Sequence, residues 1–232
     1  MTDITYTDEF EYSHKNPYHE RLEEFSEFVL RDQEGESLRG KWNSDSFKRD
    51  APLHVEIGSG YGHFMIHYCT QNPEVNFVGI DYRFKRSFQL AKKLARLEVI
   101  NFRYLRAKGE RINFLFAKQE IQRLYYFFPD PWPKKKHQKK RLFQLKFLDD
   151  ASKSLSCNGE IWIKTDHLDY ALHMEDVIKN HPHFELIFKT FDMHKNFPKH
   201  ELAQFKTKFE KIFIDQKIPI KAFIIRKIQR EK

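Results

Sequence analysis

Short β-rich runs and longer helical patterns alternate along this chain from residue 53 onward, and this alternation constrains the fold more than any other feature. Between the β-rich runs, apolar residues recur at helical spacing. Such an order predicts βαβ units, whose right-handed crossovers place parallel strands side by side in one sheet. We therefore predict an α/β fold with a doubly wound, mostly parallel sheet and helices on both faces.

The predicted elements also indicate where function should lie. Strands are expected over residues 53–57, 75–81, 102–105, 124–128, 160–165, 184–188 and 220–228. Helices are expected over residues 19–30, 62–70, 83–97, 139–155 and 170–179, with a short one from residue 110, whereas the segment between 188 and 220 receives no assignment. Ligands of such sheets bind at the carboxyl ends of the strands. Functional residues should therefore follow strands directly.

Charge is unevenly distributed over the 232 residues. Residues 1–36 hold 11 acids and 3 bases, so the remaining residues carry 38 bases against 22 acids, a net charge of +16. We predict an acidic N-terminal extension with a covering helix over residues 1–40 and a single domain over residues 41–232. Such a basic body favours a polyanionic partner, with nucleic acid or phosphate as the leading class.

Composition also excludes several classes of protein. No apolar run approaches the roughly 18 residues of a spanning helix, so a membrane protein is excluded. The first thirty residues are rich in acids and show no secretion signal. Cys69 and Cys157 lie far apart, which allows no disulfide framework or cysteine zinc site. We expect a cytoplasmic protein that is a monomer or a homodimer.

A glycine-rich turn follows the predicted strand 53–57. The sequence Glu56-Ile-Gly58-Ser-Gly60-Tyr-Gly62 holds three of the chain's 8 glycines, which let the backbone turn tightly and approach a ligand. Asp81 ends the next strand, where a carboxylate can accept hydrogen bonds from two ribose hydroxyls. Together these features predict an adenosine site, with Glu56 near the cationic end of a cofactor such as S-adenosylmethionine. The nicotinamide fingerprint is broken because His63 occupies its third glycine position.

The most informative motif is Phe-Phe-Pro-Asp130-Pro-Trp132-Pro, which follows the strand at 124–128. The prolines stiffen the chain around Asp130, and a fixed carboxylate beside an aromatic ring is suited to recognising a base. Residues 134–141 then carry six formal positive charges. Such a run is usually a solvated face, but next to this strand end it predicts a phosphate-binding patch beside an active site.

Other features are ordinary by themselves. Thr165-Asp166 ends a predicted strand, and Thr-Lys-Phe-Glu at residues 207–210 could be any charged turn. His63 and His67 have the i, i+4 spacing of two metal ligands, but Phe64 stands where the metalloprotease motif needs glutamate. We expect no metal site.

From about Trp42 to the carboxyl end, the chain resembles the bacterial tRNA (guanine-N7)-methyltransferases, which belong to the Rossmann-like class I methyltransferases. The resemblance rests on the Phe-Phe-Pro-Asp-Pro-Trp stretch with its basic continuation and on the Thr-Lys-Phe-Glu motif. It implies that S-adenosylmethionine is the cofactor, that tRNA is the partner, and that the product is N7-methylguanosine in the variable loop, at tRNA position 46.

The resemblance also implies roles for individual residues. Asp130 would be catalytic and would also contact the cofactor, which would be bound further by Glu56, Gly58, Gly60 and Asp81. Substrate would be bound by Lys134, Asp166, Thr207, Lys208, Phe209 and Glu210. RNA would be contacted by Lys136, His137, Gln138, Lys139, Lys140 and Arg141. The family usually has an Asp-Ala pair after its third strand, whereas Lys108 and Gly109 stand there in this chain, so we assign Lys108 no adenine contact.

Three alternatives stay open at this point. An adenine amino-group methyltransferase usually has Asp-Pro-Pro-aromatic, whereas Trp132 occupies the third position of this motif. A tRNA-binding module without catalysis would bind S-adenosylmethionine poorly. A nicotinamide enzyme ranks last. We prefer N7 methylation, with Glu210 or Asp166 selecting guanine by accepting hydrogen bonds from its ring NH and amino group.

Overall fold

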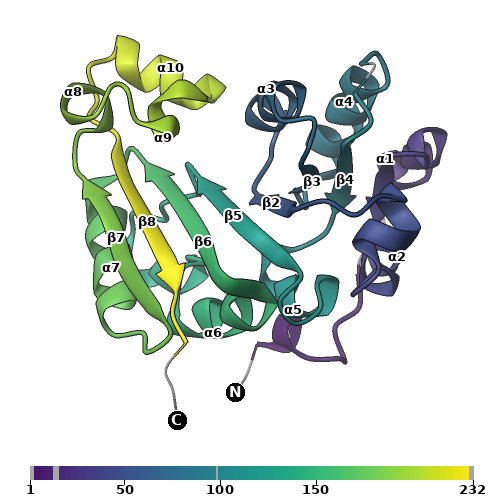
Figure 1. Cartoon of the computed structure of the whole chain (residues 1–232), viewed down its shortest axis with the longest axis horizontal. Coiled ribbons are helices and arrows are strands. Elements are labelled where there is room, and N and C mark those ends of the chain that lie inside the picture. Colours follow the sequence, from purple (N-terminus) through teal and green to yellow (C-terminus); the bar gives the residue numbers. More distant parts are fainter. Residues whose placement is uncertain (1–2, 13–15, 98, 230–232) are drawn as a thin grey trace.

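The computed structural model describes residues 3–12, 16–97 and 99–229, whose strands form one eight-stranded sheet (Figure 1). The strand order across the sheet is β1-β4-β3-β2-β5-β6-β8-β7. The strands are β1 (Val29–Arg31), β2 (Leu53–Ile57), β3 (Asn76–Ile80), β4 (Phe102–Arg106), β5 (Ile121–Phe127), β6 (Leu155–Thr165), β7 (Phe184–Thr190) and β8 (Lys221–Lys227).

The sheet is mostly parallel, as predicted. The pairs from β1 to β6 all run parallel, and only β8 is antiparallel to its neighbours β6 and β7. After β2 the chain builds β3 and β4 on one side, and it then returns to place β5 and β6 on the other. The strand order therefore reverses between β2 and β5, which is where doubly wound sheets bind ligands.

Helices cover both faces of this sheet. They are α1 (Pro17–Arg21), α2 (Gln33–Ser37), α3 (His63–Gln71), α4 (Phe84–Leu94), α5 (Ile112–Leu115), α6 (Leu145–Ser154), α7 (Leu168–Lys179), α8 (Met193–Asn196), α9 (Glu201–Gln204) and α10 (Lys208–Asp215). Short 3₁₀ segments are η1 (Ile4–Tyr6), η2 (Leu22–Phe25), η4 (Gly109–Arg111) and η5 (Lys135–Lys140), and η3 (Trp42–Phe47) is a π-helix. None of the helices in the described ranges is long and apolar enough to cross a membrane.

The core is divided by the sheet into two apolar clusters. Val55 belongs to the cluster that includes Phe147 of α6, whereas Phe77 belongs to the cluster that includes Phe64 of α3. Every residue of β2 and β3 is buried, as expected for strands that are covered on both faces. This packing fixes the carboxyl ends of β2, β3 and β5 relative to one another.

The helix expected over residues 19–30 is shorter than predicted. It ends after η2, and the chain then forms β1, which pairs in parallel with β4 through Val29 and Tyr104. The edge of β4 offers unpaired backbone groups, and pairing with them outweighs the helical spacing of the apolar residues. The predicted extension thus contributes a strand to the sheet, while its boundary at residue 40 stays a prediction.

Two further predicted elements also differ from the structure. The helix expected over residues 139–155 begins only at Leu145, because Arg141 is extended and its guanidinium Nε donates to the Pro131 carbonyl oxygen at 2.8 Å. The unassigned segment holds α8, α9 and α10. Figure 1 shows these helices together at the end of the sheet toward which β5, β6 and β7 point.

Candidate active site

The glycine turn predicted after β2 adopts a left-handed backbone at all three glycines. The φ angles are 86° at Gly58, 56° at Gly60 and 66° at Gly62, a region that is costly for residues with a side chain. A Cβ atom on Gly62 would lie 2.4 Å from Leu90 Cδ1 of α4, whereas one on Gly58 would meet no atom within 4 Å. Gly62 therefore permits close packing, and Gly58 leaves open space for a ligand at the end of β2.

Asp81 follows β3 and fixes the same turn. Its nearly buried carboxylate accepts hydrogen bonds from the backbone N–H of Gly60 at 3.0 Å and of Arg83 at 2.9 Å. The guanidinium of Arg86 lies 3.8 Å away. Each carboxylate oxygen can accept more than one hydrogen bond, so Asp81 can still accept from ribose hydroxyls.

Glu56 is a buried carboxyl group with an unsatisfied oxygen. Within the described ranges its Oε2 atom has no hydrogen-bond partner. Burial, assisted by the nearby charge of Asp81 and opposed by Ser59, raises the pKa of Glu56 to about 8. A buried acid of this kind would gain a partner from a cationic ligand, so Glu56 and the space beside Gly58 fit the cationic methionine portion of S-adenosylmethionine.

The loop that follows β5 presents Asp130 to solvent. Phe128 and Trp132 have φ angles of 50° and 43°, and such backbone strain costs of order 1–3 kcal/mol per residue. The Phe128 N–H donates to the Lys164 carbonyl oxygen of β6 at 2.8 Å, which anchors the loop. The Asp130 side chain is 64% exposed, and its Oδ2 lies 3.3 Å from Nη2 of Arg83. The carboxylate is thus held between the carboxyl ends of β3 and β5.

Two cavities meet at this loop. The first, of about 370 Å³, is lined by residues that include Asp81, Tyr82 and Lys108. The second, of about 400 Å³, is lined by residues that include Glu56 and Phe209. Their linings share Gly58, Arg86, Phe127, Phe128, Pro129 and Asp130. Asp130 therefore lies where a ligand of one cavity would meet a ligand of the other.

The Thr-Lys-Phe-Glu motif begins α10. Thr207 and Glu210 form a capping box, in which the Thr207 hydroxyl accepts from the Glu210 N–H at 3.1 Å and the Glu210 carboxylate accepts from the Thr207 N–H at 3.3 Å. Thr207, Lys208 and Phe209 line the second cavity, and Phe209 is half exposed there.

The structure does not present Glu210 to this cavity, which differs from the implied role in substrate binding. Its side chain is fully buried, Oε2 lies 2.6 Å from Lys164 Nζ, and Oε1 lies 2.9 Å from His194 Nε2. Burial opposes ionisation, but the Lys164 ammonium and His194 hold the pKa of Glu210 below its ordinary value. Glu210 thus secures α10 behind the cavity.

The other implied substrate residues take different positions. Asp166 follows β6 and lines the second cavity. Lys134 is exposed at the start of η5 and lines neither of the two cavities. Lys134 therefore belongs with the basic run that follows it.

The basic run forms η5, in which Lys136, Lys139 and Lys140 are exposed. Lys140 lines the first cavity and its Nζ lies 4.8 Å from the centre of the Trp132 ring. His137 contacts the edge of that ring. The three lysine side chains are therefore open to solvent.

Two other members of the run are tied to α7. Gln138 Nε2 lies 3.4 Å from Oδ2 of Asp169. Arg141 is nearly buried, forms an ion pair with Asp169, and lies 4.7 Å from the centre of the Tyr170 ring. We therefore correct the interpretation of Arg141: it supports the Asp130 loop through Pro131 and does not belong to the exposed charges.

Lys108 faces the N-terminal segment. It lines the first cavity, but its ammonium lies 3.3 Å from the Thr5 hydroxyl and 4.7 Å from the centre of the Phe10 ring. The Lys108 ammonium therefore already contacts Thr5 and Phe10 at this end of the cavity.

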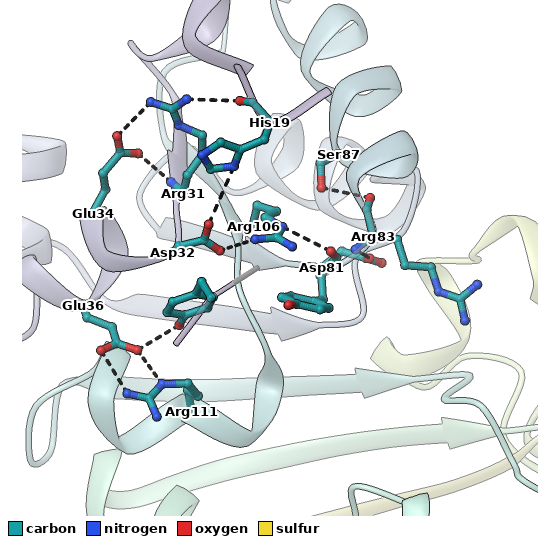
Figure 2. Close-up of polar contacts among 12 residues, drawn as sticks. His19, Arg31, Asp32, Glu34, Glu36, Asp81, Arg83, Ser87, Arg106 and Arg111 are labelled. Carbon is teal, nitrogen blue, oxygen red and sulfur yellow. Dashed lines mark hydrogen bonds and ion pairs between the residues drawn. The ribbon is translucent and has the colours of Figure 1, made fainter. Parts of the chain in front are cut away.

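Acidic residues of the N-terminal segment neutralise buried arginines (Figure 2). Arg106 at the end of β4 lies 2.5 Å from Oδ1 of Asp32 and also donates to the Tyr82 carbonyl oxygen at 3.3 Å. Arg111 makes two contacts with Glu36, at 2.5 and 3.0 Å. Because Tyr82 lines the first cavity, the N-terminal segment supports the wall of that cavity.

The sequence analysis missed Arg83 and Arg86 as parts of the site. Both line the first cavity, and Arg86 lines both. Their position directly after Asp81 was the available signal, since residues that follow strands in such sheets face the ligand. In the described ranges, no three His, Cys, Asp or Glu side chains gather in a way that could hold a metal ion.

Comparisons with known proteins show which family this chain is similar to. Residues 50–223 match the model of a family described as "Putative methyltransferase". A tRNA (guanine-N(7)-)-methyltransferase of Clostridium tetani is 35% identical over 172 residues, covering 74% of this chain and 81% of the relative. A protein of the same name from Streptococcus equi subsp. zooepidemicus is 40% identical over 149 residues, covering 64% and 69%.

A third relative joins two activities in one chain. The bifunctional glycosyltransferase/methyltransferase of Fusobacterium nucleatum is 33% identical over 207 residues, which is 88% of this chain and 31% of that protein. Among solved structures, the 16S rRNA methyltransferase KamB has a TM-score of 0.58 at 14% identity, covering 87% of this chain and 95% of that one. At this identity the structural likeness shows the class I methyltransferase fold.

Proposed function

Since this chain belongs to the family of the tRNA (guanine-N7)-methyltransferases, we propose that it methylates the guanosine at position 46, in the tRNA variable loop. Family membership makes it an enzyme that uses S-adenosylmethionine and forms N7-methylguanosine in tRNA. The position within the tRNA rests on the sequence resemblance. Because the substrate is tRNA, we also propose a cytoplasmic location, and the choice between monomer and homodimer stays a prediction.

The observation that carries the proposal is the meeting of two cavities at Asp130. A cofactor held by Asp81 in the first cavity and by Glu56 beside Gly58 would extend along the shared wall. The rest of the second cavity, bounded by Asp166 and Phe209, is then left for the target base. That base must leave its stack to enter such a pocket.

Methyl transfer to guanine N7 requires no proton transfer by the protein. When bound, S-adenosylmethionine supplies an electrophilic methyl group on a sulfonium sulfur. Guanine N7 carries a lone pair and no proton, so no side chain has to act as a general base. Positive charge develops on the purine ring during methyl transfer. The Asp130 carboxylate therefore stabilises the transition state more than it stabilises the neutral substrate base. Asp130 therefore acts through electrostatics and Arg83 positions it.

We assign the selection of guanine to Asp166. A carboxylate can accept hydrogen bonds from the ring NH and the amino group of guanine, whereas adenine has no ring NH to offer there. Asp166 lines the second cavity, while both oxygens of Glu210 are committed to Lys164 and His194. This contrast supports Asp166 over the alternative that used Glu210.

The proposal is tested with unmodified tRNA transcripts and S-adenosylmethionine, followed by nucleoside mass spectrometry. We expect N7-methylguanosine in the wild-type transcript and none in a matched transcript whose guanosine 46 is replaced by adenosine. Methylation of both transcripts would refute the position. Methyladenosine as the product would refute the base.

A further inference from the structure

A third cavity of about 510 Å³ opens beside the pocket for the target base. Its lining is Tyr61, His63, Gln89, Lys92, Lys93, Arg96 and Lys208. Tyr61, His63 and Lys208 also line the second cavity, so the two are continuous. Among the residues that the structure describes, four cationic side chains and no carboxylate line this space, which we call the basic cleft.

The cations of the basic cleft come from two helices. Gln89, Lys92, Lys93 and Arg96 have the spacing i, i+3, i+4 and i+7 and therefore extend along one face of α4 and just past its end. Lys208 begins α10 on the other side. All four cations are exposed, and within the described ranges none of them forms an ion pair. No described carboxylate thus neutralises these charges.

Helix dipoles do not explain this arrangement. The last turn of α4 favours Lys92 and Lys93, because cations near a helix C-terminus are stabilised. Lys208, however, occupies the first turn of α10, where a cation is unfavourable. His63 lies among these charges, and burial together with Lys93, Lys208 and Lys211 lowers its pKa. The cations of the basic cleft therefore repel one another in the free protein. Such an arrangement is expected of a site that binds an anion.

We propose that the basic cleft binds the phosphate backbone of the RNA next to the flipped guanosine, which rests on the proposed function. An RNA strand with a base in the second cavity must continue on both sides of it. The exposed lysines of η5 lie by the first cavity, whereas the basic cleft opens from the second. Two separate basic surfaces would then hold the two flanks of the target nucleotide and keep its base in the pocket.

The test compares two double variants that each remove two exposed charges. Lys92→Gln with Lys93→Gln changes the basic cleft, and Lys41→Gln with Lys118→Gln changes exposed lysines near the amino end of β5, opposite the site. The dissociation constant for tRNA is measured between low and moderate salt. We expect the first pair to weaken binding by about threefold to tenfold and to reduce the salt slope by about 0.7 for each lost phosphate contact. Equal slopes for the two pairs would overturn the proposal.

Lysine acetylation with and without tRNA provides a readout on the unaltered protein. Bound tRNA should protect Lys92 and Lys93 several-fold, while Lys41 and Lys118 react as before. Equal reactivity of Lys92 and Lys93 in both states would also overturn the proposal. The formation of N7-methylguanosine by wild type is measured in parallel. A wild type that methylates normally but shows no protection would refute the basic cleft alone, whereas tRNA binding with protection but no N7-methylguanosine would refute the proposed function.

Discussion

Lys164 of β6 and Glu210 of α10 form an ion pair in which neither side chain is exposed. The ammonium lies 2.6 Å from Oε2 and also donates to the carbonyl oxygens of Leu202 and Phe205, each at 3.0 Å. Through these contacts Lys164 connects β6 to both α9 and α10. This tie gives the second cavity its far wall, formed by the residues around Phe209.

Breaking this pair should destabilise the protein strongly. Glu210→Gln leaves the Lys164 ammonium buried without its counter-charge, which costs about 3–5 kcal/mol of unfolding free energy. Denaturant unfolding measures the loss, and Thr207→Ala, which removes only the cap of α10, should cost about 1 kcal/mol. Because the pKa of Glu210 is lowered by folding, its stabilisation is present above its ordinary pKa and is lost as the pH falls through the lowered value. Similar losses of unfolding free energy in Glu210→Gln and Thr207→Ala would contradict the stabilising role of the buried ion pair.

Removing the charge of Asp130 should slow turnover strongly and leave binding nearly unchanged. We expect Asp130→Asn to lower kcat by about 100-fold or more, since it removes electrostatic stabilisation of the transition state. Dissociation constants for S-adenosylmethionine and tRNA should stay close to those of wild type. Asp176→Asn, at an exposed aspartate of α7, is the control and should methylate normally. Turnover of Asp130→Asn at the wild-type rate would refute the assignment.

Neutralising the exposed lysines of η5 should weaken tRNA binding. The triple variant Lys136→Gln, Lys139→Gln and Lys140→Gln removes up to three phosphate contacts, which flattens the salt dependence of binding by about 0.7 per contact. Binding is titrated at several salt concentrations, and Lys41→Gln with Lys118→Gln serves as the control. An unchanged slope would remove η5 from the RNA-binding surface.

Binding of S-adenosylmethionine should release a proton from Glu56. Since its pKa is raised to about 8, Glu56 is mostly protonated in the free protein at pH 7, and it must ionise to pair with a cationic ligand. Calorimetric titration in buffers of different ionisation enthalpy should show a release of close to one proton at pH 7. The release should shrink as the pH rises above 8. The Glu56→Gln variant should not release this proton. Equal proton release by wild type and by Glu56→Gln would show that the cationic group of the cofactor does not pair with Glu56.

Most of the sheet could be predicted from the sequence because short β-rich runs alternate with longer helical patterns along the chain. The predicted range of β2 matches the structure at both ends, and the other predicted strands overlap those observed. The glycine turn and Asp81 could also be predicted to lie together, since the carboxyl ends of adjacent parallel strands meet at one edge. The prediction of a helix over residues 19–30 was partly wrong, because β1 forms by pairing with β4, which lies about 75 residues away in the sequence.

The alternation of strands and helices from residue 53 to residue 188 and the motifs that resemble a tRNA methyltransferase could be recognised in the sequence, because both are local patterns of side chains. Which charged residues are available to a ligand became visible only in the folded chain. Arg141 and Glu210 belong to motifs that suggest binding, yet packing buries them against Asp169 and Lys164. Lys92 belongs to no motif and Lys208 belongs to the Thr-Lys-Phe-Glu motif, yet only folding brings α4 and α10 to one cleft. Local sequence cannot show this, because the burial of a charged side chain and its nearest counter-charge depend on contacts between residues far apart in the chain.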